Sequence, residues 1–333
     1  MTGVPISMDG IQDATRALEG IVVRTPLLES FEANEILGGR LLIKAESMQR
    51  TGAFKIRGAY NRIRLLSDDE RRRGVIAYSS GNHAQGVALA ARLLGTSALI
   101  VMPDDTPVAK KIETGRLVAA IMTFSRDTES SDAIVARLSA ETGRIEVPPS
   151  GNALVHSGAG TAALELHEQA QKISADLDAV LVPCGGGGLT AATAFVMHAR
   201  SPRTQVYAAE PALFDDTRRS LAAGERVRNP MGQHTICDAI MTPTPTEMTF
   251  SINRQLLTGG VIATDDEVRR AMRFAFQMFR IVVEPGAAVG IAALLAGRID
   301  IAGQTVATFA TGGNVDAARF CDLLDSNEQE KAL

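Results

Sequence analysis

The sequence predicts an α/β fold in which parallel or mixed sheets are covered by helices on both faces. Short apolar runs rich in β-branched residues alternate with amphipathic stretches of helical length through both halves of the 333-residue chain. Glycine-rich or hydroxyl-rich turns follow several of these runs directly. Parallel strands need a crossover connection that is usually a helix, so this alternation favours buried parallel sheets. The length suits one large or two modest domains.

In the first half of the chain, each predicted strand is a short run of mainly apolar residues. These strands are Leu41–Ala45, Val75–Tyr78, Ala98–Met102 and Ala119–Phe124. The helices expected around them are Ile56–Leu66, Ala84–Leu94, Val108–Leu117 and Ser131–Thr142. A further short helix begins after Ser67, where Glu70 completes a capping box, and ends at Gly74.

The second half repeats this rhythm. Its predicted strands are Ala179–Pro183, Gln205–Ala209 and Thr305–Phe309. Its predicted helices are Ala159–Lys172, Leu189–Ala199, Glu267–Arg280 and Ala287–Ala296. Between the halves, Pro148–Asn152 is the best candidate for a crossover between two sub-domains. Ligands of parallel sheets bind beyond the carboxyl ends of the strands, so the residues that follow each strand are the candidate site.

Composition and charge exclude several classes of protein. A formal net charge of −4 argues against a nucleic-acid-binding protein, which normally has a basic excess. No apolar run approaches the roughly 20 residues of a membrane helix, and Met1–Gly10 lacks the features of a signal peptide. Cys184, Cys237 and Cys321 are widely spaced and odd in number, which favours a reducing compartment. We therefore expect a cytoplasmic enzyme with no membrane or nucleic-acid partner.

The strongest local signal is an apolar strand that leads through Gly185, Gly186, Gly187 and Gly188 into a helix. Consecutive glycines let several backbone N–H groups point into one concavity, and the helix start adds partial positive charge. This arrangement predicts a phosphate site; the alternative is a tight turn. The spacing Gly186-x-Gly188-x-x-Ala191 also fits a dinucleotide fingerprint, with Glu210 about 20 residues later. On these residues alone, a nicotinamide-dependent dehydrogenase remains an open alternative.

Three other segments contain candidate functional residues. Lys55 has apolar neighbours at the start of a helix, where burial would lower its pKa, although most such lysines lie at the surface. The turn Ser79–His83 offers hydroxyl, amide and imidazole groups at a helix start, which suits carboxylate binding; the alternative is helix capping. Thr311 precedes a Gly-Gly turn after the last strand, and that turn could equally be an ordinary one.

Together these segments resemble the fold-type II pyridoxal-phosphate enzymes, whose fold is tryptophan synthase β-like. The motifs are T-G-A-F-K-I-R-G-A, S-S-G-N-H-A-Q-G, P-C-G-G-G-G-L and T-G-G-N-V-D, in that order. The closest branch is the threonine/serine dehydratases (ammonia-lyases) and serine racemases. The resemblance runs from about Ile21 to Phe320 and displaces the dehydrogenase alternative.

The resemblance implies roles for individual residues. Lys55 would form the Schiff base with pyridoxal 5′-phosphate and act as the catalytic base, and Ser80 would serve the opposite face of Cα. The cofactor-binding residues would be Phe54, Lys55, Asn82, Gly185, Gly186, Gly187, Gly188, Leu189, Glu284 and Thr311. The substrate-binding residues would be Ser79, Ser80, Gly81 and His83. Glu210, Asp216 and the Phe214 carbonyl would bind a divalent cation, Mg²⁺ or else Ca²⁺ or Mn²⁺.

The resemblance also implies an activity and an organisation. We expect β-elimination of a small β-hydroxy amino acid, such as L-threonine or L-serine, to a 2-oxo acid and ammonia. Alternatives are an amino-acid racemase, a lyase for hydroxyaspartate or another specialised substrate, and a catalytically silent cofactor-binding protein. A large domain would comprise residues 1–69 and 152–333, with a small mobile domain at 70–151, and the chain would form a homodimer.

Some stretches depart from the usual dehydratase pattern and leave the substrate open. They include Val118-Ala119-Ala120, Ser150-Gly151-Asn152, Gly158–Thr161 and Cys237–Ala239. Thr128–Ala133 has no arginine for a second substrate carboxylate, a role that Arg280 would take over only if it turned inward. His156 lies in one altered stretch and is interpreted as a member of a polar network more readily than as a catalyst.

Overall fold

The computed structural model describes residues 5–106, 108–117, 119–125 and 130–325. Met1–Val4, Val118, Thr128 and Glu129, on which some sequence expectations rest, lie outside these residues. Within the described chain, no helix has the length and apolar character needed to span a membrane.

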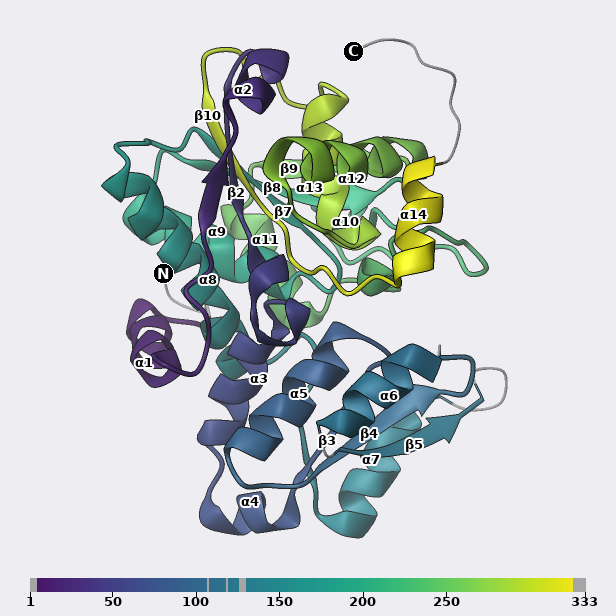
Figure 1. Cartoon of the computed structure of the whole chain (residues 1–333). Helices are drawn as coiled ribbons and strands as arrows, with labels where there is room; N and C mark the ends of the chain where they lie inside the picture. Colours follow the sequence, from purple (N-terminus) through teal and green to yellow (C-terminus); the bar gives the residue numbers. More distant parts are fainter. Residues whose placement is uncertain (1–4, 107, 118, 126–129, 326–333) are drawn as a thin grey trace.

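Two sheets organise the molecule, and each lies in its own part of it (Figure 1). The larger sheet is parallel except for its first strand and has the order β1-β2-β10-β7-β8-β9. Its strands are β1 (Leu27–Glu29), β2 (Arg40–Lys44), β7 (Ala179–Pro183), β8 (Gln205–Pro211), β9 (Gly259–Ala263) and β10 (Thr305–Phe309). The smaller sheet is parallel, in the order β5-β4-β3-β6. Its strands are β3 (Val75–Tyr78), β4 (Ala98–Pro103), β5 (Ala120–Phe124) and β6 (Ile145–Glu146).

Helices cover both faces of the larger sheet because its strand residues alternate between two cores. Val180 and Val182 pack in the core that contains α8 and α9, whereas Leu181 packs in the core that contains α12 and α13. The helices of this part are α1 (Met8–Leu18), α2 (Phe31–Leu37), α8 (Ala153–Lys172), α9 (Gly188–Arg200), α10 (Asp216–Ala223), α11 (Glu247–Leu256), α12 (Asp265–Phe279), α13 (Pro285–Leu295) and α14 (Ala317–Asp325). Short 3-10 helices are η1 (Glu46–Met48), η2 (Arg50–Gly52) and η3 (Asp238–Ile240).

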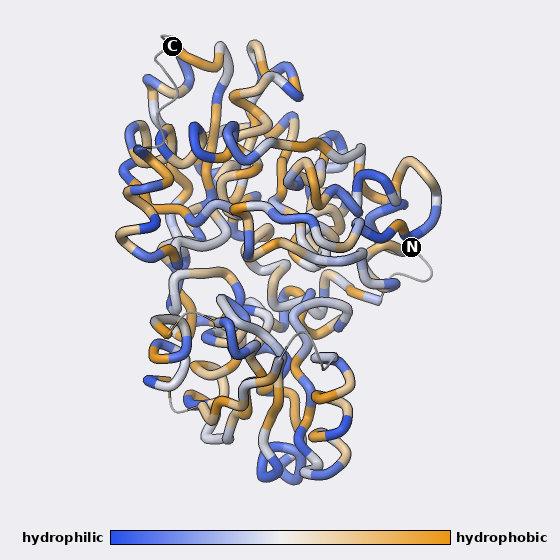
Figure 2. Tube along the Cα trace, turned by 90° about the vertical axis from the view of Figure 1, so that its right-hand side faces the viewer, coloured by the Kyte–Doolittle hydropathy of each residue, from blue (hydrophilic) through white to orange (hydrophobic). Residues whose placement is uncertain are grey.

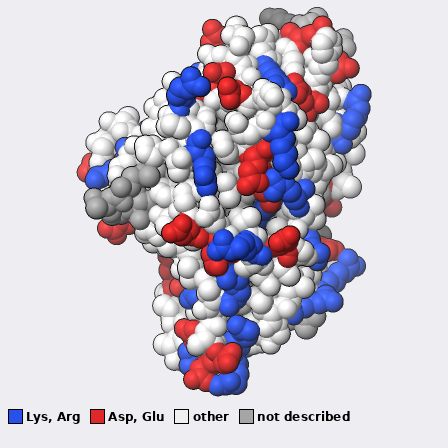
Figure 3. Space-filling model, turned by 90° about the vertical axis from the view of Figure 1, so that its left-hand side faces the viewer, with Lys and Arg blue, Asp and Glu red and all other residues white. Residues whose placement is uncertain are grey.

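The smaller sheet is built by the same rule. Val75 and Ala77 pack in one core with residues of α3 and α5, while Ile76 packs on the other side with residues of α7. The helices of this part are α4 (Asp68–Arg73), α5 (Asn82–Leu93), α6 (Val108–Arg116) and α7 (Ser131–Thr142). Helix α3 (Lys55–Arg64) lies between the two parts and packs against both α5 and α8. Hydrophobic stretches run through both parts, and the outer end of the smaller part is hydrophilic (Figure 2). On the face in Figure 3, basic and acidic side chains are interspersed.

The α/β fold class predicted from the sequence is confirmed. The capping box of Ser67 and Glu70 is present, and Gly74 ends α4. Among the predicted helices the largest difference is in α8, which begins at Ala153 rather than Ala159; the other predicted helix bounds differ by two residues or fewer. The Asn152 side chain accepts hydrogen bonds from the N–H groups of Leu154 and Val155, so the helix starts directly after the crossover.

Candidate active site

Lys55 is the first residue of α3 and is held from three directions. The Phe54 N–H donates to the Thr311 carbonyl at 3.2 Å, which ties this turn to the end of β10. The Lys55 ammonium lies 4.9 Å from the centre of the Phe54 ring and donates to the Pro149 carbonyl at 3.3 Å. A Cβ on Gly86 of α5 would come within 3.0 Å of the Lys55 backbone, so α5 approaches closely only because this residue is glycine.

The environment of Lys55 makes its amine a better base and nucleophile at neutral pH. Burial lowers the pKa of Lys55 from 10.5 to about 8, and the nearby Glu284 carboxylate opposes that shift in part. The side chain is only partly exposed. A substantial neutral fraction is therefore present at pH 7 to 8, as expected of a lysine that attacks a carbonyl or removes a proton.

The polar turn after β3 lies at the start of α5. Gly81 donates its N–H to the Ser79 hydroxyl at 3.1 Å, while the Ser80 hydroxyl has no hydrogen-bond partner among the described residues. His83 is buried and donates from Nε2 to the Val147 carbonyl at 2.8 Å. Burial lowers the pKa of His83 to about 3, with a further contribution from the positive charge of Lys55, so its imidazole is neutral.

Asn82 and Glu284 come from opposite parts of the molecule and meet beside the turn after β10. The Asn82 amide donates to Glu284 Oε1 at 2.6 Å, and Asn314 donates to Asn82 Oδ1 at 2.8 Å. A Cβ on Gly312 would lie 2.3 Å from Glu284 Oε1. The Gly-Gly turn after β10 is therefore no ordinary turn, because Gly312 is needed for the Asn82–Glu284 contact.

The glycine loop after β7 presents a set of unpaired donors. None of the backbone N–H groups of Gly185–Thr190 donates a hydrogen bond to a described residue. Gly187 is in the left-handed conformation (φ +80°), and Gly188 begins α9. Unpaired N–H groups at the start of a thirteen-residue helix form an anion site. The loop therefore fits the phosphate of the expected cofactor.

A small cavity joins the lysine to the glycine loop. It is lined by Phe54, Lys55, Gly58, Pro149, Val155, His156, Ala159, Gly188 and Leu189. Pro149 of the crossover segment, Pro148–Asn152, lines it, and the Ser150 hydroxyl of the same segment donates to the Gly186 carbonyl at 2.8 Å. The structure thus brings Lys55, Phe54, Gly188 and Leu189 into one cavity, although they were predicted from separate segments.

Two of the three candidate metal ligands, Glu210 and Asp216, lie close enough to Cys184 for their charges to add to the effect of burial, which raises the pKa of its thiol. Glu210 is buried, and its carboxylate accepts the N–H groups of Thr217 and Arg218 at 2.9 and 2.8 Å. This buried position excludes the ribose-binding role first considered for Glu210. Burial and the charge of Asp216 raise the pKa of Glu210 to about 8, and burial raises the pKa of Asp216 to about 6. Phe214 is also buried.

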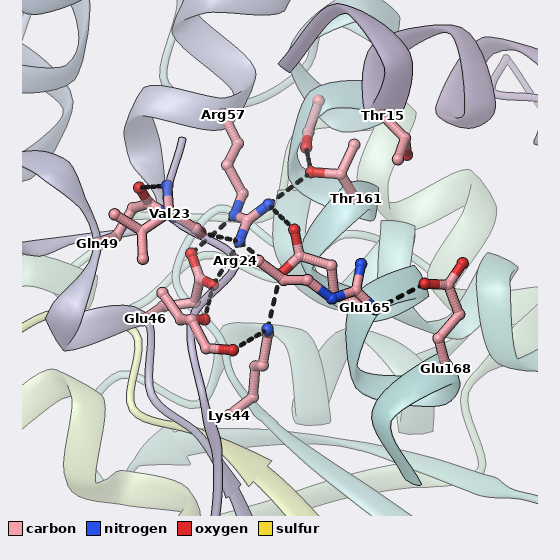
Figure 4. A network of polar contacts seen from close by, with 12 residues as sticks. Thr15, Val23, Arg24, Lys44, Glu46, Gln49, Arg57, Thr161, Glu165 and Glu168 are labelled. Carbon is pink, nitrogen blue, oxygen red and sulfur yellow. Dashed lines mark hydrogen bonds and ion pairs between the residues drawn. The ribbon is translucent and has the colours of Figure 1, made fainter. Parts of the chain in front are cut away.

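Behind Lys55 lies a buried ionic network that sequence reasoning missed (Figure 4). We call Lys44, Glu46, Arg57 and Glu165 the ionic quartet; all four side chains are buried. The Arg57 guanidinium pairs with Glu46 and Glu165, each at 2.8 Å, and Lys44 pairs with Glu165 at 2.7 Å. Their charges balance, and the quartet connects β2, η1, α3 and α8. The helix that carries Lys55 is thereby fixed to the larger part of the molecule.

Arg280 does not turn toward the cavity. It caps the end of α12 in the left-handed conformation (φ 58°) and is exposed. The possibility that Arg280 receives a second substrate carboxylate therefore finds no support in its position. Lys55 is the only lysine or arginine among the described residues that line the cavity.

Comparison with known proteins gives a consistent result. The model of the family "Pyridoxal-phosphate dependent enzyme" matches residues 18–312. The chain is 38% identical to the L-threo-3-hydroxyaspartate ammonia-lyase of Saccharomyces cerevisiae, over 96% of each chain. It is 36% identical to the L-threonine ammonia-lyase of Thermotoga maritima, over 93% of this chain and 76% of the relative. The solved structure of maize serine racemase superimposes with a TM-score of 0.90 at 32% identity, over 96% of each chain.

Proposed function

The chain belongs to the pyridoxal-phosphate dependent enzymes, and from that premise we propose that it is an ammonia-lyase. It converts a small β-hydroxy amino acid, such as L-threonine or L-serine, to a 2-oxo acid and ammonia. The observation that carries this proposal is the cavity in which Lys55, with its lowered pKa, meets the unpaired N–H groups of the glycine loop. Relatives with this activity support it.

The residues present fit pyridoxal phosphate. Unpaired N–H groups of Gly185–Leu189 would hold the phosphate, and the Lys55 amine would bind the aldehyde. Asn82 lies between Glu284 and Asn314, where its amide would face the ring hydroxyl. Thr311 would face the ring nitrogen with a neutral hydroxyl, which suits elimination at Cβ better than transamination. When bound, the cofactor supplies an electron sink for negative charge at Cα.

The protein's own groups would then perform three tasks. The unpaired hydroxyl of Ser80, with Ser79, Gly81 and the start of α5, would bind the substrate carboxylate. The Lys55 amine would remove the Cα proton. The β-hydroxyl would then leave as water: the electron pair left at Cα expels it, and the proton that Lys55 took from Cα balances the one that the departing oxygen needs. His83, neutral and bound to Val147, would keep the polar turn in place.

The preferred substrate should be a neutral amino acid. A second buried carboxylate would find no arginine among the described residues that line the cavity and would cost several kcal/mol. The second candidate is 3-hydroxyaspartate, favoured by the similarity to hydroxyaspartate ammonia-lyases from yeast and from a Pseudomonas. The test is kcat/KM for L-threonine, L-serine and both 3-hydroxyaspartate diastereomers under one set of conditions. A tenfold preference for hydroxyaspartate would replace the first candidate by the second.

Racemisation would be a competing outcome at the same site. If the Ser80 hydroxyl returns a proton to Cα from the face opposite Lys55 before the β-hydroxyl leaves, the product is the other enantiomer. Similarity to the serine racemases of rice and maize supports this alternative.

A catalytically silent protein would bind the cofactor and show its visible absorbance, but amino acids would not change that absorbance.

A divalent cation would bind Glu210, Asp216 and the Phe214 carbonyl. The Oδ2 atom of Asp216 is buried without a partner, so one ligand position is open. No group of three or more His, Cys, Asp or Glu side chains in the described ranges is arranged to hold a metal, so water would have to complete the shell. The test is the thermal midpoint with millimolar Mg²⁺ or Mn²⁺: a rise that Asp216→Asn abolishes supports the site, and no change rejects it.

The proposal also includes a two-domain organisation, a homodimer and a cytoplasmic location. Residues 1–69 with 152–333 would form the large domain, and residues 70–151 the small domain that closes over the substrate. A homodimer would cover apolar side chains such as Phe31, which is 72% exposed, and Val282. Light scattering of the purified chain tests this, and a monomer at micromolar concentration would reject it. A cytoplasmic location agrees with free Cys184, Cys237 and Cys321.

A further inference from the structure

His156 occupies a position in the site that neither motif nor charge explains. It lies in the first turn of α8, is fully buried, and lines the cavity with Lys55 and Gly188. Its Nε2 atom accepts the N–H of Gly151 at 3.1 Å. Gly151 belongs to the crossover segment and is in the left-handed conformation (φ +76°). The imidazole thus holds the backbone of that segment at a position whose left-handed conformation glycine adopts readily.

The hydrogen bond from Gly151 decides which form of the imidazole is present. A nitrogen that accepts a hydrogen bond carries no proton, so the proton of the neutral ring is on Nδ1. Burial lowers the pKa of His156 to about 4, with the positive charge of Lys55 as a further cause. His156 therefore acts in the free protein as a hydrogen-bond acceptor, and its buried Nδ1 has no partner among the described residues.

The ring also contacts the phosphate-binding end of α9. A Cβ on Gly188 would lie 3.1 Å from Cδ2 and Nε2 of His156, and 3.5 Å from the Ser150 hydroxyl. Cα–Cβ bonds tilt toward the N-terminus of a helix. The His156 ring and the Ser150 hydroxyl therefore lie beyond the N-terminal end of α9, where the unpaired N–H groups attract an anion. Ser150 is in turn bound to Gly186. Two consecutive crossover residues, Ser150 and Gly151, are therefore fixed over the glycine loop.

We propose that His156 is a positioning residue of the phosphate site. By accepting the N–H of Gly151, it holds Ser150 at the mouth of the glycine loop. There the Ser150 hydroxyl donates to the Gly186 carbonyl and so fixes the loop with its unpaired N–H groups free to bind the phosphate of the cofactor. The contribution is to phosphate affinity and not to the reaction of Lys55 with the aldehyde. This inference rests on the proposed function, because it takes pyridoxal phosphate as the ligand.

The test compares two ligands that differ only in the phosphate. Cofactor-free protein is titrated with pyridoxal phosphate and with pyridoxal, and visible absorbance gives both dissociation constants. The variants are His156→Leu, His156→Asn and His156→Gln. The Gln side chain can place an acceptor where Nε2 lies, whereas Asn replaces only Nδ1. His167→Leu, on the same helix but outside the cavity, is the matched control, and the thermal midpoint of each cofactor-free variant reports its fold.

We expect His156→Leu and His156→Asn to weaken pyridoxal phosphate binding at least about tenfold, the factor for one lost hydrogen bond. Pyridoxal binding should stay within twofold, and His156→Gln and His167→Leu should resemble the unaltered protein. Equal losses for both ligands, or a loss in His156→Gln as large as in His156→Leu, would overturn the inference while leaving the proposed function intact. Failure of the unaltered protein to bind pyridoxal phosphate would instead reject the proposed function, and this inference with it.

Discussion

Lys55 combines a covalent role with a base role, and both need the neutral amine. Its pKa of about 8 predicts that capture of pyridoxal phosphate by the cofactor-free protein accelerates about tenfold per pH unit below pH 8 and levels off above it. Stopped-flow absorbance between pH 6 and 10 measures this. In the unfolded chain this lysine keeps its proton up to about pH 10.5. The contribution of Lys55 to the free energy of unfolding therefore becomes more favourable as pH rises from 8 to 10.5. A capture midpoint near 10.5 would contradict the described environment.

Ser80 provides the second prediction at the level of one residue. Its hydroxyl is half-buried and has no partner among the described residues, so it is available to the substrate. Ser80→Ala should remove any interconversion of L- and D-serine and leave elimination from the L-enantiomer within severalfold. Chiral chromatography together with a 2-oxo acid assay separates the two activities. D-serine formation that survives the substitution would show that another group serves the opposite face.

Among the elements, α3 is held in place both by close backbone packing and by buried ion pairs. A Cβ on Gly158 of α8 would lie 2.3 Å from the Arg57 carbonyl, so the two helices meet backbone to backbone. The ionic quartet then joins the same helix to β2 and η1. Every nitrogen of Arg57 has an oxygen partner, which is what a buried guanidinium requires. Lys55 is consequently presented from a helix that is anchored before the cofactor arrives.

Arg57→Met tests this anchoring. It would leave Glu46 and Glu165 buried with only Lys44 to balance them, which should lower the free energy of unfolding by about 3 to 5 kcal/mol. The control is Arg24→Met, which breaks the exposed pair of Arg24 with Glu168 and should cost at most about 1 kcal/mol. Urea unfolding of both cofactor-free variants gives the two values. Equal losses would mean that the quartet stabilises no more than a surface pair.

Across the whole molecule, the sequence predicted those helices and strands whose formation depends on residues close together in the chain. Strand β7 is a continuous buried run, and β3, β7, β10 and α7 have the predicted bounds. Strands β1 and β6 have only three and two residues, and β9 begins with two glycines, so their sequences contain little strand signal. The polar turn, the glycine loop and Thr311 were identifiable because each follows a strand, whereas Lys55 was identified from its place at the start of a helix. The ionic quartet was not identifiable, because Arg57 and Glu165 are 108 residues apart and only the fold brings them together. His156 was interpreted as a member of a polar network, but its partner Gly151 could be identified only from the structure.

One measurement tests the central claim most directly. The purified chain, loaded with pyridoxal phosphate, is incubated with L-threonine or L-serine beside the Lys55→Ala variant, and 2-oxo acid and ammonia are measured in the same samples. Circular dichroism establishes that the variant is folded. We predict that the unaltered chain releases both products in equal amounts and that Lys55→Ala releases neither and lacks the visible absorbance of the bound cofactor. Undiminished release by folded Lys55→Ala, or no release by the loaded chain from either amino acid, would contradict the account.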